Sequence, residues 1–115
     1  MDWDECIKNN IINEIQTDIN KINSIRKIAN EKIRSAEFLP NDHKVSRITL
    51  FYDALRELLE AKALEKGFKI YNHECYTAFL KEIMKKSNEG NLFDEMRKIR
   101  NGINYYGKQI NDDET

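Results

Sequence analysis

The sequence predicts an all-α domain: an antiparallel up-and-down bundle of four helices that covers residues 1–115. Apolar side chains recur every three or four residues in four segments, which is typical of amphipathic helices. Helix-breaking residues separate these segments near Pro40, Gly67 and Gly90. No segment shows the alternating pattern that indicates a strand, and 115 residues suffice for one hydrophobic core.

The first helix is expected from about Asp4 to Ala36. Its apolar stripe consists of isoleucines that step by fours and threes: Ile7, Ile11, Ile15, Ile19, Ile22 and Ile25. Because β-branched residues lower intrinsic helix propensity, packing must stabilise this helix. Pro40 ends the segment, and Asp42 is the expected N-cap of the next helix.

The second helix is expected from about His43 to Lys66, with Gly67 as the residue that ends it. It carries two apolar stripes. The larger consists of Ile48, Phe51, Tyr52, Leu55, Leu58 and Leu59, and the smaller of Leu50, Ala54, Ala61 and Leu64. Contact on two sides indicates either a central position in the bundle or one side given to a partner chain.

The third helix is expected to begin after the N-cap Asn72 and to run through Met84. A turn at 87–90 precedes the fourth helix, which begins at Asn91. One face of this fourth helix should be core: Leu92, Met96, Ile99, Ile103, Tyr106 and Ile110. The opposite arc holds Arg97, Arg100, Asn101, Asn104, Tyr105 and Lys108. Such a face suits a phosphate or nucleotide; alternatively, it is a solvated helix end whose basic residues favour the helix dipole.

Arg100-Asn101, three further residues and then the ring of Tyr105 resemble the signature of the HEPN family of small all-helical domains. That signature is an arginine, a polar residue and a histidine a few residues beyond. The segment from Tyr52 to Cys75 is similar to the middle helices of archaeal-type members. This sequence has Tyr105 where the family has its histidine, and the resemblance implies a final helix that the sequence does not contain.

The resemblance implies a metal-independent endoribonuclease of toxin type, in which a ribose 2′-hydroxyl attacks its own phosphate. Arg100 would stabilise the charged phosphorane, Asn101 would orient the phosphate, and Tyr105 would take the role of the histidine. With an ordinary pKa near ~10, tyrosine is a poor base at neutral pH. We therefore expect weak or absent cleavage, with RNA or nucleotide binding retained through Arg97, Arg100, Asn104 and Lys108.

Two alternatives remain: a non-catalytic module that dimerises and binds a nucleotide or partners a minimal nucleotidyltransferase, and a purely structural helical protein. Arg100 and Tyr105 lie about 140° apart around one helix. A homodimer that shares the site across a two-fold axis is therefore expected, with the fourth helix and the smaller stripe in its interface. Asp53 or Glu57 is a candidate to orient Arg100 or to act as a base, unless both are simply solvated.

The remaining features exclude several classes of function. The net charge is −1, so the overall charge does not drive the chain onto nucleic acid. Cys6 and Cys75 are expected to be free structural thiols. His43 and His73 lack ligand-like spacing, and neither a metal nor another cofactor is predicted. The absence of a long apolar run predicts no membrane span, and the acidic N-terminus without an apolar segment predicts a cytoplasmic protein.

Overall fold

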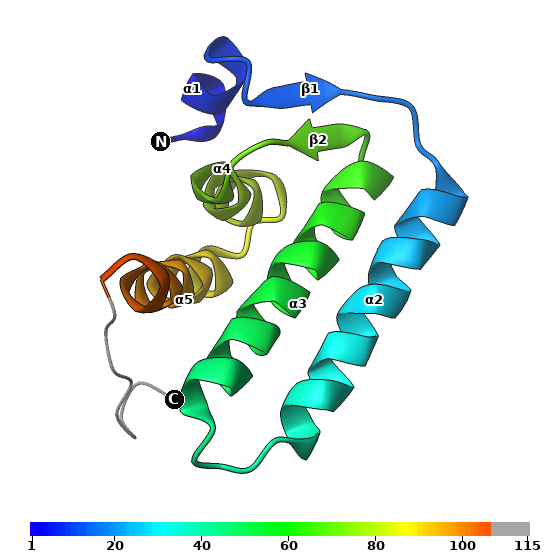
Figure 1. Cartoon of the computed structure of the whole chain (residues 1–115). Coiled ribbons are helices and arrows are strands. Elements are labelled where there is room, and N and C mark those ends of the chain that lie inside the picture. Colours follow the sequence, from blue (N-terminus) through cyan, green and yellow to red (C-terminus); the bar gives the residue numbers. More distant parts are fainter. Residues whose placement is uncertain (107–115) are drawn as a thin grey trace.

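The computed structural model describes residues 1–106, with side chains as far as residue 102, and these residues form a mainly helical protein, as predicted (Figure 1). In chain order the elements are α1 (Trp3–Lys8), β1 (Ile12–Glu14), α2 (Ile19–Phe38), α3 (Lys44–Glu65), β2 (Phe68–Ile70), α4 (His73–Ala78), the π-helical turn η1 (Phe79–Ile83) and α5 (Ser87–Tyr106). Over residues 1–106, no helix combines the length and apolar character needed to cross a membrane.

Helix α3 is the central element. Figure 1 shows α2 beside it along its length, while α4 and α5 lie on its other side and are seen almost along their axes. Tyr52 and Leu59 of α3 belong to the main core, whereas Ala61 and Leu64 pack with Ile22 of α2. Both predicted apolar stripes of α3 therefore contribute residues to core contacts within the protomer. The expectation that the smaller stripe forms a dimer interface is wrong, because Ala61, Leu64 and also Ala54 are buried in the protomer.

The prediction of a single first helix from Asp4 to Ala36 is wrong. Helix α1 ends at Lys8, Asn10 adopts φ 59°, and β1 pairs antiparallel with β2 in a register that aligns Ile12 with Ile70. Both of these isoleucines are buried. The pairing of β1 with β2 provides hydrogen-bond partners for backbone N–H and C=O groups of this segment, which a helix would otherwise have paired internally. Helix α2 then starts afresh at its N-cap Asp18, whose carboxylate accepts a hydrogen bond from the Lys21 amide.

The other helix boundaries are partly as predicted. Helix α3 closely matches its expected range, and Gly67 follows it with φ 86°, a left-handed conformation that glycine adopts without strain. Asp42 is not the N-cap of α3; that position is taken by His43. The predicted turn at 87–90 is also wrong, since α5 already begins at Ser87. The chain turns earlier, at Lys85, which has φ 58°.

Cys6 and Cys75 form a disulfide, which contradicts the expectation of free thiols. The two residues are 69 positions apart in the sequence, so their spacing gave no sign of the pairing. The small sheet brings them together, because it continues into a hydrogen bond from the Tyr71 amide to the Ile11 carbonyl (2.9 Å). This pairing carries α1 over α4, where both cysteines are fully buried in the main core.

Candidate phosphate-binding site

Helix α5 is rotated relative to the prediction. Phe93 is fully buried and Leu92 is 56% exposed, so Leu92 is wrong as a core residue, while Met96 and Ile99 are partly buried. The ring of Phe93 stacks on Tyr52, with centroids 5.4 Å apart and planes at 16°. Phenylalanine buries more apolar area than leucine and gains this ring contact, which explains the rotation.

This rotation turns Arg97 and Arg100 toward α3 and α4. They lie four and seven positions after Phe93, and such residues share one face of a helix. The side chain of Arg100 is only 23% exposed. The two arginines, which were predicted for the arc opposite the core, therefore lie at the edge of the core, where their charges are less screened by water.

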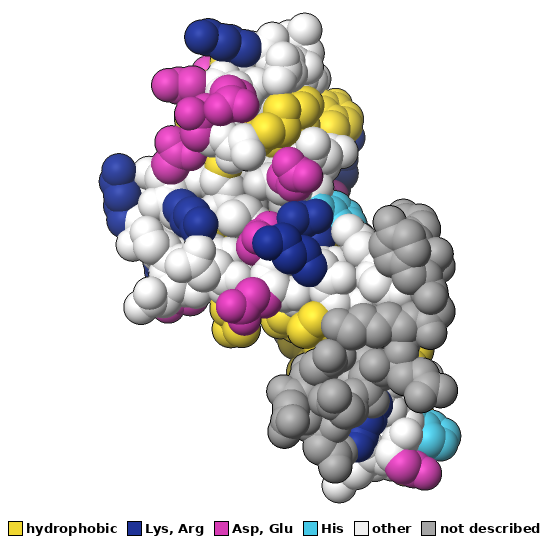
Figure 2. All heavy atoms as spheres, turned by 90° about the vertical axis from the view of Figure 1, so that its left-hand side faces the viewer, with side chains coloured by type: hydrophobic (Ala, Val, Ile, Leu, Met, Phe, Trp, Pro, Cys, Tyr) yellow, Lys and Arg dark blue, Asp and Glu magenta, His cyan; other side chains and the backbone are white. Residues whose placement is uncertain are grey.

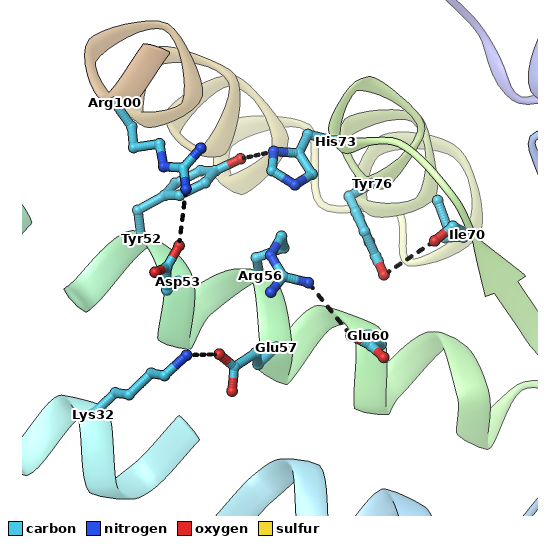
Figure 3. A network of polar contacts seen from close by, with 10 residues as sticks. All are labelled: Lys32, Tyr52, Asp53, Arg56, Glu57, Glu60, Ile70, His73, Tyr76 and Arg100. Carbon is cyan, nitrogen blue, oxygen red and sulfur yellow. Dashed lines mark hydrogen bonds and ion pairs between the residues drawn. The ribbon is translucent and has the colours of Figure 1, made fainter. Parts of the chain in front are cut away.

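Arg100 contacts two neighbouring residues of α3. Its guanidinium carbon lies 5.7 Å from the centre of the Tyr52 ring, within the range of a cation–π interaction. Its Nη2 atom is 3.6 Å from Asp53 Oδ1, which is an ion pair longer than a direct hydrogen bond. The expectation that Asp53 orients Arg100 is consistent with this ion pair. Glu57 instead pairs with Lys32 of α2 on the other side of α3 (Figure 3).

Tyr52 also contacts His73, the first residue of α4. The Tyr52 hydroxyl oxygen and His73 Nδ1 are 2.8 Å apart, and the ring centroids are 5.6 Å apart. The start of α4 is fixed by Asn72, whose side chain accepts a hydrogen bond from the Cys75 amide as predicted. Figure 3 shows Arg100 and His73 reaching Tyr52 from α5 and α4, respectively. One buried phenol ring thus holds a guanidinium and an imidazole in place.

Two further arginines belong to this region. Arg97 donates hydrogen bonds to Asp94 Oδ1 from Nη2 (2.8 Å) and Nε (3.2 Å), and Arg56 pairs with Glu60 at 3.4 Å. We call Tyr52, Arg56, His73, Arg97 and Arg100 the arginine–histidine cluster. Figure 2 shows basic side chains and a histidine next to one another on the face that includes α5.

The cluster changes the protonation of its members. Burial lowers the pKa of His73, and the charges of Arg56, Arg100 and Arg97 lower it further, while Asp53 opposes them. Burial raises the pKa of Tyr52 to about 12, with Arg100 the largest opposing charge. At neutral pH the histidine is therefore neutral and the tyrosine keeps its proton. Burial would raise the pKa of Asp94, but hydrogen bonds from Arg97 and Lys98 outweigh burial and lower it.

Beside the cluster, Arg97 lines an open cavity of about 430 Å³ between α4, η1 and α5. The cavity wall carries charges of both signs, because Lys81 and Lys98 face Glu74, Glu82 and Asp94 there. This mixture does not by itself select an anionic ligand. The arginine–histidine cluster is the more specific feature.

The predicted site residues divide into two groups. Arg97, Arg100 and Asn101 are described and partly buried on α5. Asn104 and Tyr105 belong to the helical backbone of α5, but their side chains lie outside the described residues, as does Lys108. His73 and Tyr52 were missed as site residues, because they lie in other helices and no spacing along the chain relates them to Arg100.

No protein-family model, no curated protein and no solved structure matches this chain. The likeness to HEPN domains therefore rests on the residues quoted for it. Among residues 1–102, no group of three or more His, Cys, Asp or Glu side chains is arranged to hold a metal ion.

Proposed function

We propose that the protein is a HEPN-like domain that binds RNA or a nucleotide through its phosphate groups. The observation that carries this proposal is the position of Arg100, which is held over Tyr52 at 5.7 Å beside the imidazole of His73. A guanidinium presents N–H donors in a planar fork that matches two phosphate oxygens. The neutral imidazole adds a polar group without a competing negative charge.

The existing ion pairs are compatible with such a ligand. Asp53 Oδ1 lies 3.6 Å from Arg100 Nη2, an ion pair longer than a direct hydrogen bond, so a phosphate oxygen at hydrogen-bond distance would add a shorter contact to the same guanidinium. Arg97 is held by Asp94 and lines the adjacent cavity, where a second phosphate of the same strand would lie. Asn101, Asn104 and Lys108 extend the proposed surface along α5.

A variant pair tests the binding. Arg100→Ala should weaken binding of a short single-stranded RNA by roughly 10-fold or more, since a charge-assisted hydrogen bond contributes about 1.5–3 kcal/mol. Fluorescence anisotropy at low salt measures the affinity, and thermal melting checks that the variant is folded. The matched control is Arg34→Ala, which removes the same charge from an exposed position on α2. Equal losses in both variants, or no binding by the wild type at low salt, contradict the proposal.

We also propose that the protein is a homodimer. An apolar depression of about 380 Å³ is lined by residues of α2, α3 and α5: Ile33, Ile48, Phe51, Leu55, Leu58 and Met96. It includes part of the larger stripe of α3, in place of the smaller stripe that is buried. A two-fold axis beside α5 would bring Arg100 of one protomer toward Tyr105 of its partner.

Sedimentation equilibrium at micromolar concentration tests the dimer. The wild type should have twice the chain mass of 13.6 kDa, and Phe51→Glu should be monomeric because it places a charge in the apolar depression. Val45→Glu, at an exposed position of the same helix, is the control. A monomeric wild type contradicts the proposal and favours the alternative in which this surface binds a minimal nucleotidyltransferase.

A further inference from the structure

We propose that the cavity beside the arginine–histidine cluster is a base pocket that selects guanine in single-stranded RNA. Glu74 accepts the hydrogen bonds of guanine N1–H and N2–H, and Lys81 donates one to guanine O6. This inference rests on the proposed binding of RNA at the cluster. It goes further because it assigns a base and the two side chains that recognise it.

The cavity continues the proposed phosphate-binding surface. Its volume of about 430 Å³ lies within the range of small-molecule sites, and its open mouth admits a base from solvent. Arg97 belongs both to the cluster and to the cavity wall. A strand whose phosphate is bound by Arg97 can therefore place the adjoining base in the cavity.

The cavity wall carries more negative charge than a site for phosphates alone would need. Four carboxylates line it, those of Asp2, Glu74, Glu82 and Asp94, and Figure 2 shows acidic side chains among basic ones on the face that includes α5. A carboxylate repels phosphate but accepts hydrogen bonds from N–H groups. RNA offers such donors on its bases, so the acidic side of this wall fits a base better than a phosphate.

Two oppositely charged side chains of the wall are available to a ligand. The carboxylates of Asp2 and Glu82 accept hydrogen bonds from backbone amides at 2.8 and 2.7 Å, and Asp94 pairs with two basic side chains of its own helix. Those pairs also occupy the two basic residues that α5 contributes to the wall. Glu74 and Lys81 have no ion-pair partner within residues 1–102, so both can contact a ligand without breaking an existing contact.

Glu74 and Lys81 share one face of the segment formed by α4 and η1. They are seven residues apart, and Thr77 and Ala78 between them line the same wall, as expected for the i, i+3, i+4 and i+7 positions of a helix. Lys81 belongs to the π-helical turn Phe79–Ile83. Such turns occur frequently at functional sites. An acceptor and a donor thus face the cavity from one continuous segment.

Gly90 of α5 fixes the course of the Lys81 side chain. A Cβ atom at Gly90 would lie only 2.6 Å from Lys81 Cγ, so the aliphatic part of the lysine passes directly over the glycine. Gly90 is buried beneath it. This packing restricts the lysine before a ligand arrives, which lowers the entropy lost on binding.

Guanine is the base whose hydrogen-bonding groups match this pair. Its Watson–Crick edge carries two neighbouring N–H donors, at N1 and N2, and the acceptor O6 lies beside them. A carboxylate accepts both donors at once, and an ammonium group donates to O6. Adenine, cytosine and uracil do not present two neighbouring donors on this edge. They would therefore leave one carboxylate oxygen of Glu74 without a partner.

Short oligouridines that differ in one central nucleotide test the selectivity. The wild-type protein should bind the RNA with a central guanosine roughly 5- to 100-fold more tightly than the RNA with adenosine, the usual discrimination of one bidentate base contact. Inosine lacks the amino group at N2 and should bind with intermediate affinity. Fluorescence anisotropy at low salt measures each dissociation constant.

Matched variants assign the preference to the two side chains. Glu74→Gln should remove most of the preference for guanosine without weakening the adenosine RNA, whereas Glu89→Gln, at an exposed position of α5, should keep it. Lys81→Met and Lys86→Met both remove one positive charge and should lower the affinity for every RNA. Only Lys81→Met should also lower the ratio between guanosine and adenosine.

The salt dependence separates base contacts from phosphate contacts. Added salt should weaken all the RNAs together, while the ratio between guanosine and adenosine stays constant, because both strands neutralise the same number of phosphates. Equal binding of the two RNAs overturns this inference and leaves the proposed RNA-binding function in place. A preference that persists in Glu74→Gln also overturns it. Absence of binding to every RNA overturns both.

Discussion

Glu57 illustrates how one buried charge constrains the molecule. It is 7% exposed in the middle of α3 and pairs with Lys32 of α2, the helix with which α3 makes its longest contact. The alternative in which this carboxylate is solvated is therefore wrong. Its partner lies on the side of α3 away from α5, so Glu57 joins the helices and does not face the arginine–histidine cluster.

Removing the partner of Glu57 should destabilise the protein. We expect Lys32→Met to lower the free energy of unfolding by about 1–3 kcal/mol, because it leaves a buried carboxylate without its counter-charge while Lys32 itself is partly exposed. Adding Glu57→Leu should recover most of that loss. Urea unfolding at pH 7 measures both. The reference pair is Arg26 and Glu65 on the surface of the same two helices, where Arg26→Met should cost clearly less than Lys32→Met because water screens an exposed ion pair.

His73 should make the folded state sensitive to acid. Its pKa is lowered in the folded protein, so the unfolded chain binds a proton more readily. The associated stability is fully present above the unfolded pKa of about 6.5 and is lost as the pH falls through the lower folded pKa. We expect the free energy of unfolding to fall between pH 7 and pH 5, with a smaller slope in His73→Asn. An NMR titration that gives His73 a pKa of 6.5 or higher would contradict this.

The start of α4 depends on a single capping side chain. Asn72 accepts the hydrogen bond of the Cys75 amide, and Asn72→Ala should destabilise the protein by about 1 kcal/mol. Asp42→Ala provides the contrast, because Asp42 was expected to cap α3 but lies outside its N-cap position. We expect that variant to change stability by less than about 0.5 kcal/mol. Thermal unfolding compares the two, and equal effects would mean that the capping geometry is unimportant.

The helices that could be predicted are those whose signals are local. Helix α3 has a long apolar pattern and is followed by Gly67 with φ 86°, and both of its ends were predicted closely. The segment before α2 was misread because Ile7, Ile11, Ile15 and Ile19 continue the helical spacing across a turn and a strand. Strand β1 has only three residues and pairs with residues more than fifty positions away, so no local alternation announces it.

The candidate site shows the same difference between local signals, which the sequence displays, and contacts between distant segments, which it does not. Arg100 lies within a short motif and was predicted as a site residue from that motif, and Asp53 was predicted as a candidate to orient it. His73 was considered only as a metal ligand, since its nearness to Arg100 depends on how α4 and α5 pack around Tyr52 and no spacing in the sequence indicates it. The predicted orientation of Arg97 and Arg100, away from the core, was also wrong. Phe93 rather than Leu92 fills the core, and this rotates α5 about its axis.

The disulfide connects the N-terminal helix to the rest of the molecule. Cys6 and Cys75 close a loop of about seventy residues, for which the chain-entropy model gives about 4 kcal/mol of stabilisation. Reduction with dithiothreitol should therefore lower the unfolding temperature markedly. The double variant Cys6→Ala/Cys75→Ala should show the same decrease and no further response to the reductant. Unchanged melting in both cases would mean that α1 is held by its packing alone.

This bond also bears on the cytoplasmic location expected from the sequence. Reducing compartments keep most cysteine pairs open, whereas oxidising compartments preserve disulfides. In a reducing compartment, α1 would be retained only by the short β1–β2 pairing and by contacts such as that of Trp3 with Phe68. Limited proteolysis with and without reductant should then cut first between α1 and α2.

Tyr52 belongs to the hydrophobic core and to the candidate site at once. Its ring stacks on Phe93, its hydroxyl contacts His73, and the guanidinium of Arg100 lies over the ring. Because the same ring fills the core and supports both side chains, a substitution that removes it should disturb the stability of the protein and the geometry of the site together. The polar side chains of the cluster that surround this ring come from three helices: Arg56 from α3, His73 from α4, and Arg97 and Arg100 from α5. These side chains can be exchanged while Tyr52 and the core around it stay as they are, so the specificity of this surface can change without a change of fold.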